Sequence, residues 1–173
     1  MLSVFLWTGI LLFTLHRTNS SLGKIDGKTG FVHAFLLWIF LMSFSTSFKM
    51  LGWAFGHTSD IKKYFYIPVG PIPDWFNLIM WAAFLVFGIA AMLLTFELAK
   101  RKEKYRKIFV KLLPIFYLLS VYEFAKSFYL AGSTEDASIL LAVSIGLLVF
   151  AIPFGSMFYF YSKESVKEKI FAE

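Results

Sequence analysis

The stretch that most constrains the fold is residues 108–131, IFVKLLPIFYLLSVYEFAKSFYLA, which is long and apolar enough to cross a bilayer. It nevertheless carries Glu123 and Lys126 well inside. An ionisable group in hydrocarbon is costly and needs a partner, so each of these residues is a functional-site hypothesis. We therefore expect the other helices of the chain to gather around this segment.

The composition supports a membrane protein. The 173 residues are 58% hydrophobic and only 16% charged, whereas a soluble domain averages about 45–50% apolar and about 25% charged residues. The apolar runs predict an all-α bundle in a single domain at 1–173, with five transmembrane helices. If the short first run does not span the membrane, four helices remain. The predicted spans are at about 1–16, 31–55, 75–99, 108–131 and 138–161, followed by a charged cytoplasmic tail at 162–173.

Basic residues predict the orientation of these spans. The segment KRKEKYRK at 100–107 holds six basic residues against Glu103, which is typical of a cytoplasmic loop. Alternation then places the loop at 16–30 and the carboxyl terminus inside, and the amino terminus outside. We expect an integral protein of the inner (plasma) membrane of a bacterium.

Polar residues on two predicted spans fall at matching heights. At about 1.5 Å per residue, Lys49 and Lys126 both lie roughly 27 Å from the start of their helices, and Glu123 lies near 22 Å. The resulting candidate cluster for a ligand or ion consists of Glu123, Lys126, Lys49, Ser120, Ser43 and Thr46. The alternative is structural: the lysines reach the outer headgroups, and Glu123 is paired only to orient two helices.

Histidines give weaker candidates. His57 and Asp60 in the outer loop resemble an acid–base or metal pair, but they lack further ligands. His16 and His33 lie near the inner boundary, where a histidine is more often exposed or hydrogen-bonded to backbone than bound to haem or metal. The chain has no cysteine, which excludes disulfides and thiolate sites. No catalytic motif is present, so we expect no catalytic residue, no metal site and no cofactor.

Several functions remain open. The net charge of +6 comes from basic residues at the ends of apolar runs, which argues against a nucleic-acid partner. We expect membrane lipids, other membrane subunits or a second copy as partners. The first hypothesis is a non-catalytic accessory or partner-binding subunit. The alternatives are an oligomeric transporter or channel component with a polar site around Glu123, Lys49 and Lys126, and a lipid-acting enzyme that uses Glu123 or His57.

Overall fold

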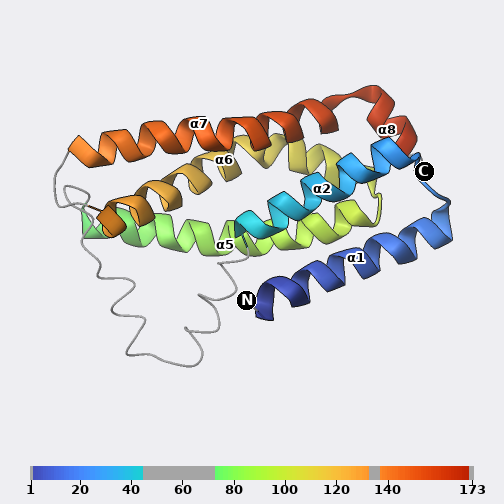
Figure 1. Ribbon diagram of the computed structural model, residues 1–173, viewed down its shortest axis with the longest axis horizontal. Helices are drawn as coiled ribbons and strands as arrows, with labels where there is room; N and C mark the ends of the chain where they lie inside the picture. Colours follow the sequence, from blue (N-terminus) through green and yellow to red (C-terminus); the bar gives the residue numbers. More distant parts are fainter. Residues whose placement is uncertain (1, 45–72, 133–136, 172–173) are drawn as a thin grey trace.

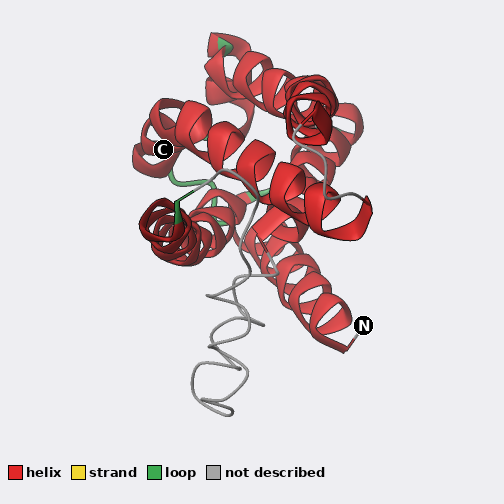
Figure 2. Cartoon of the chain, turned by 90° about the vertical axis from the view of Figure 1, so that its left-hand side faces the viewer, coloured by secondary structure: helices red, strands yellow, loops and turns green. Residues whose placement is uncertain are grey.

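The computed structural model describes residues 2–44, 73–132 and 137–171. These residues are helical almost throughout, and Figures 1 and 2 show long helices packed side by side with no strand in the described part. The helices are α1 (Leu2–Leu22), α2 (Gly27–Phe44), α5 (Asp74–Ala99), α6 (Glu103–Gly132), α7 (Ala137–Ser162) and the short α8 (Glu164–Ile170). The predicted all-α bundle is confirmed.

Within the described residues, four helices are long and apolar enough to cross a membrane. These segments are Gly27–Phe44, Ala82–Ala99, Glu103–Ala125 and Val143–Ser162. They indicate an integral membrane protein. Helix α1 is not among them, because its second half is polar. The five-span count therefore stays a prediction.

The first connection is shorter than the sequence predicts. Residues 16–22 continue α1, and the hydroxyl of Ser20 donates to the carbonyl of His16 at 2.8 Å. Gly23 ends the helix with φ of 90°, a left-handed conformation that glycine adopts without steric cost. Asp26 then starts α2, because its Oδ1 accepts from the backbone N–H groups of Lys28 (3.0 Å) and Thr29 (3.2 Å).

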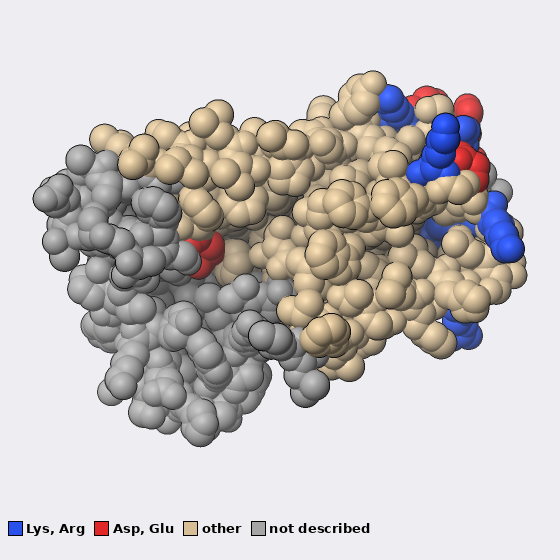
Figure 3. Space-filling view, in the orientation of Figure 1, with Lys and Arg blue, Asp and Glu red and all other residues tan. Residues whose placement is uncertain are grey.

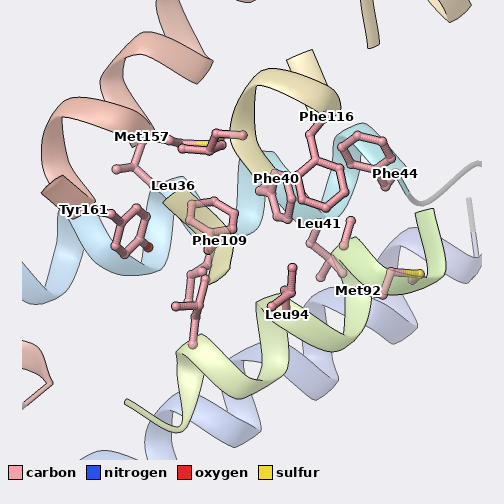
Figure 4. Packing of buried hydrophobic residues seen from close by; sticks show 14 of the residues in the cluster. Leu36, Phe40, Leu41, Phe44, Met92, Leu94, Phe109, Phe116, Met157 and Tyr161 are labelled. Carbon is pink, nitrogen blue, oxygen red and sulfur yellow. The ribbon is translucent and has the colours of Figure 1, made fainter. Parts of the chain in front are cut away.

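The core is a cluster of aromatic and aliphatic side chains centred on α2 and α6. The ring of Phe40 lies 4.8 Å from that of Phe109 and 5.1 Å from that of Phe116, in edge-to-face arrangements. Leucine and methionine side chains of α2, α5 and α7 surround these rings (Figure 4). The buried residues of α2 recur every three to four positions, as expected for one helical face: His33, Leu36, Leu37, Phe40, Leu41 and Phe44.

Charged side chains gather at one end of the bundle, seen at the right of Figure 3. Helix α8 lies at the same end in Figure 1. It belongs to the segment that the sequence predicts as a charged tail. Within that segment, Val166, Ile170 and Phe171 are buried in the core, and the cytoplasmic location of the tail stays a prediction. An amphipathic helix thus closes this end, which we call the basic end.

Candidate functional site

The predicted polar cluster is only partly described. Lys49 and Thr46 lie outside the described residues, as do His57 and Asp60, and the side chain of Lys126 is not described. Glu123 is half-buried on α6. The pairing of Glu123 with a lysine therefore remains a prediction.

The two serines of the cluster differ in their bonding. The hydroxyl of Ser43 donates to the carbonyl of Ile39 in its own helix at 2.9 Å, so it has no further proton to donate to a ligand. Ser120 is 5% exposed, and its hydroxyl has no hydrogen-bond partner among the described residues. It precedes Glu123 by three residues and therefore shares a face of α6 with that carboxylate. A buried hydroxyl without a partner is costly, so Ser120 stays a candidate for binding a polar ligand.

A second polar group lies inside the basic end and contains His33, a weak candidate from the sequence whose pairing with Tyr161 was not predicted. His33 is fully buried, and its Nδ1 lies 3.0 Å from the phenolic oxygen of Tyr161 on α7. The ring also contacts Phe171 edge-on at 5.9 Å. Its Nε2 has no hydrogen-bond partner among the described residues. The histidine therefore joins α2 to the end of α7 and to the carboxy-terminal segment.

Arg106 ties α6 to the end of α7. Its Nε and a terminal nitrogen donate to the two oxygens of Glu103 at 2.5 Å and 2.7 Å, a bidentate arrangement that fixes the guanidinium plane. The other terminal nitrogen donates to the backbone carbonyl of Tyr161. Arg106 is 8% exposed, so this ion pair is screened from water. It holds the Tyr161 backbone where the phenol can meet His33.

Arg101 connects three further segments. It lies in the α5–α6 turn with φ of 61°, a left-handed backbone conformation that residues other than glycine rarely adopt. Its Nε donates to the carbonyl of Ile170 at 2.6 Å, and a terminal nitrogen donates to the carbonyl of Gly23 at 2.8 Å. Both carbonyls lie at the carboxyl ends of helices, where backbone carbonyls have no hydrogen-bond donor within the helix. Arg101 therefore joins the α1–α2 connection to α8.

A different feature, an apolar groove of about 390 Å³, opens on the outer surface between α6 and α7. Pro114 of α6 lies on one side of it. Ala151 and Gly155, one turn apart on α7, lie on the other. The remaining lining consists of Leu113, Tyr117, Phe154 and Phe158. Two small residues four positions apart are the pattern that lets the backbone of another transmembrane helix approach closely.

The two glycines of α7 serve different purposes. A Cβ at Gly146 would lie 3.0 Å from Cδ1 of Phe124 and 3.4 Å from Cγ1 of Val121, so a larger residue there would press against α6. A Cβ at Gly155 would meet nothing within 4 Å. Packing within the described chain therefore does not require glycine at position 155.

Among the described residues, no group of three or more histidine, aspartate or glutamate side chains is placed to hold a metal ion. Comparisons with protein-family models, with curated proteins and with solved structures find no match to this chain.

Proposed function

We propose that this protein is a partner-binding subunit of a membrane assembly, and that the groove between α6 and α7 receives a transmembrane helix. The observation that carries the proposal is Gly155, an exposed glycine that the chain's own packing does not need. In lipid, helices associate through close backbone contact, because burying apolar side chains gains little. Ala151 and Gly155 offer such a contact.

The simplest partner is a second copy of the chain. The same small-residue stripe on two copies makes a self-complementary interface about a two-fold axis. The surrounding surface of α7 is apolar, with Leu148 72% exposed and Ile152 76% exposed. This surface is therefore compatible with either lipid or a neighbouring helix. At Ala151 and Gly155 the small residues favour a neighbouring helix.

The absence of native cysteine makes the test direct. Gly155→Cys places a thiol in the groove, whereas Val149→Cys places one on another face of α7, at a residue that is 51% exposed. We expect oxidation in native membranes to give a covalent dimer from Gly155→Cys and much less from Val149→Cys. Equal dimer formation from both variants, or none from either, would contradict self-association through this groove.

The proposed orientation places the basic end in the cytoplasm of a bacterium, in its inner membrane. The support is the gathering of lysine and arginine at that end (Figure 3). Lys24, exposed in the α1–α2 connection, gives the test. A Lys24→Cys variant should react with a membrane-impermeant maleimide only after the cells are opened. Labelling in intact cells would reverse the orientation.

A small transporter or channel component is the second candidate, and Ser120 is the observation that favours it. Its unpartnered hydroxyl and the half-buried Glu123 would suit a proton or ion path. Proteoliposomes that contain a pH-sensitive dye should then show proton entry that Glu123→Gln abolishes. Equal proton entry with both proteins and with empty vesicles would exclude a proton path through Glu123.

A further inference from the structure

A pocket of about 330 Å³ lies between α1 and the end of α5, apart from the α6–α7 groove. Helix α1 is fixed against the bundle by Leu11, which is 1% exposed, and by the ring of Trp7, 5.9 Å from that of Phe96 on α5. The pocket is therefore bounded by packed helices. Its lining residues are Phe13, Thr14, Arg17, Thr18, Ser21, Leu22 and Lys100.

The pocket carries an excess of positive charge. Arg17 is exposed and makes no ion pair or hydrogen bond through its side chain in the described part of the chain. Lys100 lies 2.5 Å from Glu97, but Lys102 lies 2.5 Å from the same carboxylate. Two lysines thus share one carboxylate, and Arg17 has no anionic partner among the described residues. The helix dipoles of α1 and α5 oppose an anion here, but their effect is confined to the last turn and is smaller than a full charge.

One hydroxyl in the pocket is available as a donor. Thr14 donates to the carbonyl of Ile10 at 2.8 Å, and Ser21 donates to the carbonyl of Thr18 at 3.1 Å. Thr18 is 8% exposed, and none of the side-chain hydrogen bonds between described residues is donated by its hydroxyl. A ligand with acceptor oxygens could therefore bind Arg17, Lys100 and Thr18 together.

An apolar groove of about 630 Å³ continues from this pocket along α1. It is lined by Phe5, Leu6, Gly9, Ile10 and Phe13, and the last of these also lines the charged pocket. A Cβ at Gly9 would meet nothing within 4 Å, so the floor of the groove is open. From Arg17 to Phe5 the helix rises roughly 18 Å at about 1.5 Å per residue. That length is close to one leaflet's share of a hydrocarbon core of about 30 Å.

We propose that the pocket and the groove together bind one anionic glycerophospholipid. The phosphate lies between Arg17 and Lys100, and one acyl chain follows the groove over Gly9. Charge complementarity selects an anionic headgroup, and the apolar continuation selects a lipid over a soluble phosphate. The site lies on α1 and α5, so it is independent of the proposed helix association at α6 and α7.

The test is native mass spectrometry of the full-length protein in a mild non-ionic detergent. Dioleoylphosphatidylglycerol and dioleoylphosphatidylcholine are titrated separately, with glycerol 1-phosphate as a soluble competitor. Arg17→Gln removes the unpaired cation, and Gly9→Phe fills the groove. Lys24→Gln is the matched control, because it removes one charge at the same end without lining the pocket. Circular dichroism checks that each variant stays helical.

We expect the wild-type protein to hold one phosphatidylglycerol more tightly than phosphatidylcholine. Arg17→Gln should weaken phosphatidylglycerol binding about fivefold, the effect of one basic residue near an anionic headgroup. Gly9→Phe should weaken the binding of both lipids. Lys24→Gln should leave it within about twofold of wild type, because Lys24 does not line the pocket and its charge is screened over the longer distance.

Four results would overturn the proposal. Equal losses from Arg17→Gln and Lys24→Gln would mean a diffuse charge effect. Displacement of the lipid by glycerol 1-phosphate would show that the groove binds no acyl chain. Unchanged lipid binding in Gly9→Phe would show the same. A dimer that Gly9→Phe abolishes would assign the groove to a second copy instead.

Discussion

The phenolic oxygen of Tyr161 and Nδ1 of His33 lie 3.0 Å apart in the interior of the basic end, although 128 positions separate the two residues in the chain. Both side chains are completely buried. This hydrogen bond links the beginning of α2 to the end of α7, and it places a polar pair within an otherwise apolar core.

Tyr161→Phe tests what this hydrogen bond contributes. The substitution keeps the ring contacts and the backbone bond to Arg106, but it leaves both ring nitrogens of His33 without a normal hydrogen bond. We expect the free energy of unfolding to fall by about 1–3 kcal/mol, the cost of a buried polar group that loses its partner. Denaturant unfolding in detergent micelles measures this change. Tyr159→Phe, at a residue 65% exposed, is the control and should change stability by less than about 0.5 kcal/mol.

Arg101 allows backbone strain to be separated from hydrogen bonding. Arg101→Ala removes both side-chain bonds and keeps a Cβ at φ of 61°, whereas Arg101→Gly removes the bonds but relieves the strain. Both variants should be less stable than wild type. The free energy of unfolding should be about 1 kcal/mol higher for the glycine variant than for the alanine variant. Equal stability of the two variants would contradict a strained left-handed turn, and Lys104→Ala serves as an exposed control.

Asp26 predicts a pH dependence at the start of α2. Hydrogen bonds from the side chain and backbone of Thr29 lower the pKa of Asp26 from 3.8 to about 2. The folded state therefore favours the ionised carboxylate, and this contribution to stability is fully present above about pH 4. It is lost as the pH falls through about 2, since the proton then binds in both states. Asp26→Asn should remove this component from the difference between unfolding midpoints at pH 5 and pH 2. An identical pH profile in the variant would refute the assignment.

Gly146 and Gly155 make a matched pair on one helix. Alanine is a better helix former than glycine by about 1 kcal/mol. Gly155→Ala should gain part of that amount, because its Cβ enters open space. Gly146→Ala should instead lower the unfolding free energy, because its Cβ would press against Phe124 and Val121. Thermal unfolding of the two variants, compared in the same detergent, decides between them. A more stable Gly146→Ala protein would mean that α6 and α7 pack less tightly there.

Much of the helical architecture could be predicted from hydropathy alone. The run at 75–99 corresponds to α5 (Asp74–Ala99), and the run at 138–161 corresponds to α7 (Ala137–Ser162). Apolar length decides these elements, so their bounds follow directly from the sequence. The start of α6 at Glu103 could not be predicted this way, because its first turn is charged and lies outside the apolar run.

The site was harder to predict than the fold. Helical rise gives the height of Ser120 and Glu123, but it does not give the rotation of α6 relative to its neighbours. The pairing of His33 with Tyr161 depends in the same way on the rotations of α2 and α7. The contact of Phe171 with His33 depends on the packing of α8, which the charged composition of residues 162–173 did not indicate. A signal was present: Val166 and Ile170 are spaced by one turn within that charged segment. The hydrogen bonds of Arg101 depend on its positive φ, which no pattern of side chains indicates.

The docking of α8 has a consequence for how this protein is made. Phe171 contacts the ring of His33, and Ile170 supplies the acceptor for Arg101. During translation these residues emerge only after α7 has been synthesised. The helices made earlier therefore lack these contacts until α8 has been synthesised and has packed against them.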